Sequence, residues 1–137
     1  MKLAAGVEVI QTSFWGRPLN LLLVGRQELV LVDSGLTSTP AQAVLPTLRS
    51  LGLSPRALGQ VIITHAHADH FGGNEEIWLA SGRRACFAAH RLDQAWIEDP
   101  GGETRKAYGR YVELGLMAAD ALEDGIRASG NGVRLTR

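Results

Sequence analysis

The sequence predicts one α/β (α+β) domain in which antiparallel strands lead into a strand–helix–strand crossover. Two observations support this prediction. Three short apolar segments lie close together near the N-terminus and are separated by turn residues, as in an antiparallel meander. A helical pattern and another buried strand then follow, which is the order of a crossover unit. The length of 137 residues fits a single domain with a core of its own.

The three segments of the meander are short and bounded by turns. Residues 7–14 read as the first strand, and the next residues supply a turn with Gly16 and Pro18. Residues 19–24 and 29–32 read as the second and third strands. We therefore expect a three-stranded antiparallel sheet in the first quarter of the chain.

The crossover comprises a helix and a buried strand. Ser38 and Thr39 followed by Pro40 predict a helix start, and Gly52 predicts its end. Pro46 lies inside this pattern and is expected to bend or divide the helix. Residues 60–64 are β-branched and apolar after a glycine, which is typical of a strand covered on both faces.

Four possible metal ligands follow that strand directly. If the backbone stays extended, His65 and His67 point to the same side and can bind one ion. A turn must follow, and it could bring Asp69 and His70 to a second position beside the first. The alternative is a polar loop whose side chains only stabilise a turn.

The ligand types favour catalysis over a structural role. Imidazole and carboxylate with an open position are the zinc ligands of catalytic sites, whereas structural sites are closed and rich in cysteine. Two ions about 3.5 to 4 Å apart can share a hydroxide that is nucleophilic at neutral pH. The cluster therefore predicts metal-assisted hydrolysis.

Residues 64–73, with the sequence THAHADHFGG, resemble the metal-binding signature of the metallo-β-lactamase superfamily, in the form seen in glyoxalase II-like hydrolases. The resemblance implies that His65 and His67 serve a first metal and that Asp69 and His70 serve a second. Asp69 would also be catalytic, because it would orient the attacking water. The implied cofactor is Zn²⁺, two ions per site, with Fe or Mn as possible replacements.

The third strand ends in Asp33, Ser34 and Gly35, which also resembles the superfamily. Metal-site imidazoles need another partner to fix their tautomer and orientation. We favour Asp33 as this support behind the histidine loop. Turn or cap duty is the main alternative, and direct ligation is a third.

The segment after the loop contains further candidates. Gly72 and Gly73 are expected to open a short helix where a Cβ would crowd the ligands. Residues 83–87 predict a strand in which Cys86 is a small core residue. We expect His90 to be a surface residue at a helix start, and we consider this more consistent with the sequence than a role as a metal ligand.

The remaining chain reads as largely helical. We expect a short helix over residues 90–98, a break at residues 99–102, and one long helix over residues 103–128 that its glycines could divide, with its apolar side chains mostly inward. Trp96, Tyr108 and Tyr111 could line the roof of a substrate pocket, although plain packing is the favoured reading. Residues 133–137 read as the start of a strand.

The resemblance covers only the first part of the superfamily's sandwich of two αβ halves. We expect a single domain over residues 1–137, with a matched core over 7–90 and a helical insertion over 91–128. No histidine follows His90, so each metal would have only two protein ligands. A truncated hydrolase is the leading explanation, ahead of completion by another copy or partner and of a weak metal site. The exposed sheet face and edge of a half-sandwich favour self-association.

Composition limits the function. Lys plus Arg and Asp plus Glu number 14 each, so no net charge directs the chain to nucleic acid. No run of residues is long and apolar enough to cross a membrane, the N-terminus does not resemble a signal peptide, and the single cysteine fits a reducing compartment. We expect a cytoplasmic hydrolase of a small ester, thioester or lactone. The alternatives are a non-catalytic metal-binding or assembly fragment, an iron-dependent redox enzyme, and a nuclease.

Overall fold

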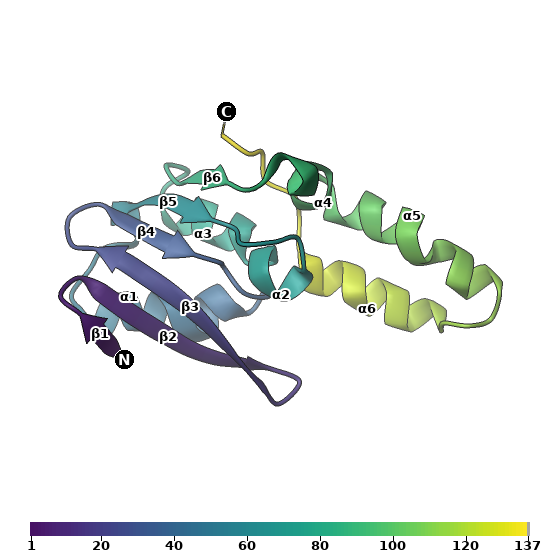
Figure 1. The fold of residues 1–137 in the computed structure, drawn as a ribbon, viewed down its shortest axis with the longest axis horizontal. Helices are drawn as coiled ribbons and strands as arrows, with labels where there is room; N and C mark the ends of the chain where they lie inside the picture. Colours follow the sequence, from purple (N-terminus) through teal and green to yellow (C-terminus); the bar gives the residue numbers. More distant parts are fainter. Residues whose placement is uncertain (137) are drawn as a thin grey trace.

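A six-stranded mixed sheet forms the centre of the computed structural model, which describes residues 1–136 (Figure 1). The strands follow one another across the sheet in chain order. The first strand was not expected from the sequence, whereas the second, third and fourth strands fall where the three strands of the meander were predicted. Their bounds are Lys2–Ala4 (β1), Val7–Phe14 (β2), Arg17–Gly25 (β3), Leu29–Val32 (β4), Leu58–Ile62 (β5) and Cys86–Ala88 (β6).

The direction of the strands changes in the middle of the sheet. Strands β1 to β4 pair antiparallel, whereas β4, β5 and β6 are parallel. Val32 lies opposite Ile62, and Ile62 lies opposite Ala88, so these three strands end at the same edge. The predicted change from a meander to a crossover is confirmed, and the residues that follow β4 and β5 are brought side by side.

The helical elements alternate with the later strands. Pro40–Val44 (η1) is π-helical and Leu45–Ser50 (α1) is α-helical. The backbone stays helical through Val44 and Leu45, so the hydrogen-bonding pattern changes just before Pro46 without a break, and the expected bend stays a prediction. The other elements are short except for the last two helices. They are Pro55–Ala57 (η2), Ala68–Phe71 (α2), Asn74–Ala80 (α3), Arg91–Asp93 (η3), Gln94–Glu98 (α4), Pro100–Glu113 (α5) and Ala119–Ser129 (α6).

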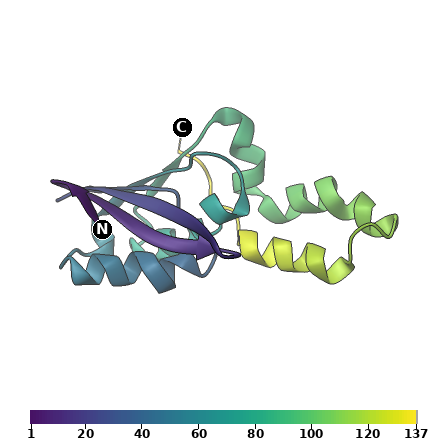
Figure 2. The same ribbon diagram turned by 60° about the horizontal axis from the view of Figure 1, so that its bottom comes forward.

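The core lies on one face of the sheet. Alternate residues of the strands, among them Leu21, Leu31 and Val61, are fully buried there with Leu48 of α1 and Ile77 of α3. Both helices lie on this face (Figures 1 and 2). The burial of this apolar face provides the main driving force for folding.

The opposite face of the sheet is only partly covered. Val24 of β3 retains 36% of its accessible surface, and Ile62 of β5 retains 39%. Cys86 of β6 is also exposed, which corrects its prediction as a core residue. Cys86 pairs in register with Gln60, another exposed residue, while its neighbour Phe87 points into the core. The alternation of a strand places Cys86 on the face away from the helices.

The prediction of one long helix over residues 103–128 is wrong as an unbroken element, since α5 and α6 form an antiparallel hairpin (Figure 1). Gly115 adopts a left-handed conformation with φ +70° and lies in the turn, so a glycine does divide the helix. The hairpin is also less buried than expected. Tyr108, Tyr111 and Leu114 are exposed, and Leu116 retains 71% of its surface, because the turn carries them away from the sheet.

Other differences are local. The predicted break at residues 99–102 instead begins α5, where Asp99 Oδ1 accepts a hydrogen bond of 3.0 Å from Gly102 N. The segment after Ser129 forms no strand within the described residues, although Thr136 N donates to Phe87 O at 2.7 Å. Residue 137 of the predicted strand lies outside the described residues. The division into a core over 7–90 and an insertion over 91–128 stays a prediction.

No helix within residues 1–136 is both long enough and apolar enough to cross a membrane.

Gly72 allows α6 to approach closely the end of the loop that carries His65, His67, Asp69 and His70. A Cβ at this position would lie 2.5 Å from Ala128 O and 2.7 Å from Ala68 O. Both atoms are backbone, so neither can move without shifting its helix. A glycine is therefore required here by neighbouring helices and not, as the sequence suggested, by the ligand side chains.

We predict that Gly72→Ala lowers the free energy of unfolding by about 1 to 3 kcal/mol through overpacking. Gly109→Ala is the matched control, because nothing lies within 4 Å of a Cβ built there in α5. The control is expected to gain up to about 1 kcal/mol from helix propensity. Urea unfolding of both variants measures the difference, and equal stabilities would contradict the close approach.

Candidate metal centre

The histidine loop begins where β5 ends at Ile62, two residues earlier than the sequence suggested. Ile63 is still attached to the neighbouring strand, because its N–H donates to Ala88 O at 2.8 Å. The backbone then turns instead of staying extended, and His67 N donates to His65 O at 3.1 Å. The loop therefore projects from the edge at which the parallel strands end, a common place for ligand sites in α/β sheets.

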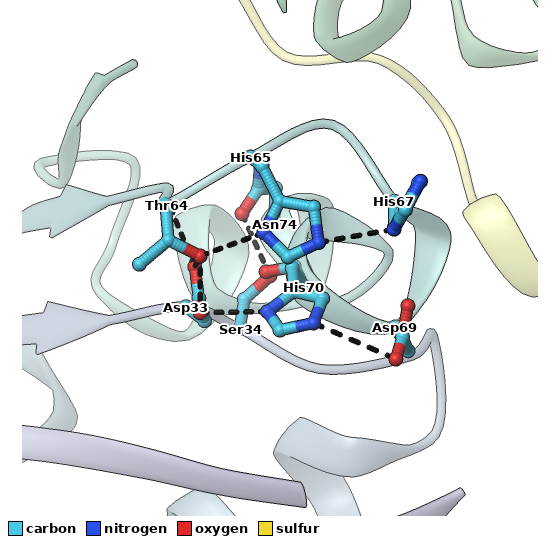
Figure 3. Close-up of polar contacts among 8 residues, drawn as sticks. All are labelled: Asp33, Ser34, Thr64, His65, His67, Asp69, His70 and Asn74. Carbon is cyan, nitrogen blue, oxygen red and sulfur yellow. Dashed lines mark hydrogen bonds and ion pairs between the residues drawn. The ribbon is translucent and has the colours of Figure 1, made fainter. Parts of the chain in front are cut away.

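His65 and His67 form the first pair of donors. Nε2 of His65 lies 3.0 Å from Nδ1 of His67, and the two rings meet edge to face (Figure 3). In a tetrahedral zinc site with Zn–N of about 2.05 Å, two nitrogen ligands lie roughly 3.3 Å apart. The turned backbone thus brings the two nitrogens to nearly the separation that a shared ion requires.

Asp69 and His70 form the second pair. Both lie on the single turn of α2, and Nε2 of His70 is 3.6 Å from Oδ2 of Asp69 (Figure 3). The rings of His65 and His70 are 4.0 Å apart between centroids, so the two pairs are neighbours. The turn expected after His67 is this short helix.

The Asp33 carboxylate joins the two ends of the loop. Its Oδ1 accepts a hydrogen bond of 2.8 Å from Thr64 N, at the start of the loop. Its Oδ2 lies 2.7 Å from Nδ1 of His70, at the end of the loop. The carboxylate is buried, and Asp33 has φ +62°, a conformation that aspartate tolerates better than most residues. Both carboxylate oxygens are thus engaged by Thr64 and His70, which is the geometry of a support.

Asp33 also determines which ring nitrogens carry protons. A carboxylate only accepts hydrogen bonds, so Nδ1 of His70 must donate to it and Nε2 is left with its lone pair. The Thr64 hydroxyl donates to Asp33 Oδ2 at 2.8 Å, and its oxygen can then accept from Nδ1 of His65 at 3.1 Å. In both histidines the lone pair of Nε2 is directed toward the donor cluster, as metal ligation requires.

The lowered pKa of His65 also favours a role as a metal ligand. Burial lowers the pKa of the His65 imidazole, and the neighbouring His70 and His67 rings lower it further, against the opposing effect of Asp33 and Asp69. The neutral form, which is the form that binds a metal, is thereby favoured.

The chemical types of the donors fit a zinc-type ion, but each ion would have only two of them as ligands. Neutral imidazole nitrogens and a carboxylate are ligands that zinc accepts. Within residues 1–136, however, no three His, Cys, Asp or Glu side chains converge as a single ion would need. Each pair would thus hold an ion by two ligands and leave its other positions open.

Two residues behind the loop were not identified from the sequence. The Ser34 hydroxyl donates to Asn74 Oδ1 at 2.7 Å, and Ser34 N donates to His70 O at 2.8 Å. Asn74 is almost completely buried, and its Nδ2 has no hydrogen-bond partner within the described residues. The contact links residues 40 positions apart, so the only signal in the sequence was a polar residue directly after two glycines.

His90 lies apart from the cluster. It is exposed at the start of η3, where its Nδ1 accepts a hydrogen bond of 3.3 Å from Leu92 N. This is the position at a helix start that the sequence indicated.

A cavity of about 520 Å³ lies between the metal loop and the helical hairpin. Its floor includes His65, His67 and Phe71, and its other walls come from α4, α5 and α6. Trp96 and Tyr108 line it, whereas Tyr111 is absent from the described lining and its ring lies 6.3 Å from that of Tyr108. Two of the three aromatic residues considered from the sequence thus face the space above the donors.

Comparison with known proteins identifies relatives of this chain. The family model described as the metallo-beta-lactamase superfamily matches residues 15–129. A hydroxyacylglutathione hydrolase of Methylococcus capsulatus is 34% identical over 102 residues, which are 72% of this chain and 37% of that protein. A ribonuclease J of Sinorhizobium meliloti is 35% identical over 69 residues, which are 47% of this chain and 11% of that protein.

Solved structures share the fold. A metallo-beta-lactamase family protein of Thermus thermophilus aligns with a TM-score of 0.71 at 21% identity, over 99% of this chain and 47% of that chain. A class B3 di-zinc metallo-beta-lactamase from an Alaskan soil metagenome aligns with a TM-score of 0.59 at 24% identity, over 72% of this chain and 35% of that chain. The chain thus spans less than half the length of these relatives, and it belongs to the metallo-β-lactamase superfamily.

Proposed function

We propose that this chain supplies the metal-binding half of a hydrolase that cleaves an ester, thioester or lactone. The observation that supports this proposal is the loop fixed by Asp33, in which two pairs of donors are neighbours and one pair, His65 and His67, lies at the floor of a cavity. Zinc, when bound, supplies Lewis acidity and a water that ionises near neutral pH. Hydrolysis is the chemistry that this combination serves best.

The roles of the chain's own residues follow from their contacts. His65 and His67 would hold one ion, and Asp69 and His70 would hold the other. Asp69 is partly exposed beside His70, so its carboxylate could also accept a proton from water and orient it. Asp33 would keep Nε2 of His65 and Nε2 of His70 unprotonated, and it would not contact the substrate.

The relatives favour zinc and an acyl substrate. A hydroxyacylglutathione hydrolase acts on a thioester, and one structural neighbour is titled a di-zinc enzyme. We therefore propose two zinc ions and a small acyl compound for this chain. Iron or manganese remains the alternative metal, since imidazole and carboxylate bind these ions as well.

Further ligands would have to come from outside the described residues. Each donor pair is incomplete, and the sheet face bearing Val24 and Ile62 is partly exposed and apolar. We propose that a C-terminal half or a second copy of the chain covers this face and completes the site. The alternative is a metal-binding or assembly module without turnover of its own.

RNA cleavage is the second candidate, because ribonuclease J is among the relatives. The chain carries no net charge, and phosphate backbones are normally bound by cations. We therefore favour a small-molecule substrate. We also propose a cytoplasmic location, which the single free cysteine supports.

The ligand assignment predicts that His67→Ala and Asp69→Ala each abolish tight zinc binding, since each removes half of a donor pair. His90→Ala is the control, because His90 is exposed and its Nδ1 accepts a hydrogen bond from Leu92 N at the start of η3. Isothermal titration of zinc into the three variants measures the effect. Wild-type affinity in His67→Ala would refute the assignment.

The Asp33→Asn variant tests the support role. An amide can donate to Nδ1 of His70 and so favour the wrong tautomer, and loss of such a partner typically lowers metal affinity about 10- to 100-fold. Asp120→Asn, an exposed position in the first turn of α6, is the control. Circular dichroism should show both variants folded, and an unchanged zinc affinity in folded Asp33→Asn would contradict the role.

The hydrolase proposal predicts cleavage of 4-nitrophenyl butyrate or of a neutral thioester by the zinc-loaded protein. The activity should disappear with a chelator, return with zinc, and be absent in the double variant His65→Ala/His67→Ala. Hydrolysis that survives in the double variant would contradict the proposal. A folded, zinc-loaded chain that cleaves no ester, thioester or lactone would instead favour the non-catalytic module.

A further inference from the structure

The cavity above His65 and His67 has few charged side chains. Its lining within the described residues contains no lysine or arginine, and Asp93 provides its one carboxylate. The other walls are mostly apolar or aromatic and include Phe71, Trp96, Tyr108 and Leu122. An anionic group in this half-open cavity would find no lysine or arginine among these residues to pair with.

The lysine and arginine side chains of α5 and α6 form ion pairs outside the cavity. Arg105 pairs with Glu123 at 2.6 Å, Lys106 with Glu103 at 2.5 Å and Arg110 with Glu113 at 3.0 Å. Arg127 pairs with Asp124. None of these eight residues belongs to the described lining of the cavity. All the lysine and arginine residues of α5 and α6 are therefore engaged outside the cavity.

From this charge balance we propose that the cavity binds a neutral, apolar acyl chain of the substrate. The proposal rests on the proposed hydrolase function and narrows it, because it disfavours anionic groups such as those of glutathione or RNA in this space. The apolar walls would hold the chain while the scissile carbonyl lies over His65 and His67. Asp93 would add repulsion against a carboxylate or phosphate.

Gly125 offers a direct way to fill the cavity. It lies in α6, lines the cavity, and a Cβ built on it has nothing within 4 Å. A side chain at this position would therefore begin in open space beside the cavity. Gly109 of α5 is the matched control, since its Cβ would also be in open space but it does not line the cavity.

The experiment uses neutral ligands that cannot be hydrolysed, titrated calorimetrically into the chelator-treated protein. Heptan-2-one, nonan-2-one and undecan-2-one should bind with affinities that rise about fourfold for each added CH2 until the cavity is full. 9-Oxodecanoate, which is nonan-2-one with a carboxylate added at the far end, should bind at least tenfold more weakly than nonan-2-one. Without metal, the carboxylate cannot gain affinity by ligation.

The two variants test whether the binding occurs in this cavity. Gly125→Phe should weaken undecan-2-one binding by more than tenfold, and Gly109→Phe should leave it unchanged, with both variants folded by circular dichroism. Equal affinity for all chain lengths, preference for the carboxylate, or equal effects of the two variants would overturn the proposal. Because these titrations need no metal, they fail or succeed independently of the hydrolysis assay with zinc.

Discussion

The carboxylate of Asp33 is the contact on which the candidate site depends. It receives hydrogen bonds from Thr64 and His70 at the two ends of the histidine loop, and these contacts favour one tautomer of His70 and, through the Thr64 hydroxyl, of His65. The parallel pairing of β4 and β5 makes this possible, because it brings the residues after Val32 and Ile62 to the same edge of the sheet. Asp33 N itself donates to Ile62 O at 2.9 Å, so the support is part of the sheet.

The rest of the fold keeps this edge in place. Ser34 and Asn74 connect the Asp33 turn to the helix that follows the loop. Gly72 lets α6 pack against the loop, and α6 brings one wall of the cavity above the donors. The sheet, the loop and the hairpin therefore act together, since a shift in any one of them changes the space over His65.

Much of the fold could be predicted because its signals are local. The β-branched and apolar runs identified the meander, and a cluster of four donors after a strand identified the loop. The reversal between α5 and α6 could not be predicted with confidence, because helical periodicity is the same on both sides of Gly115. The exposure of Cys86 depends on which sheet face the helices cover, and the contact between Ser34 and Asn74 depends on the fold. Neither is visible in a local pattern.

The metal content of the purified chain tests the central claim most directly. Elemental mass spectrometry after zinc loading and gel filtration would be compared with the variant in which His65, His67, Asp69 and His70 are all alanine. Light scattering on the same samples gives the oligomeric state. We predict zinc bound to the wild-type chain, up to two ions per chain when a second copy completes the site, and none above background in the variant. Equal zinc in both proteins would contradict this prediction.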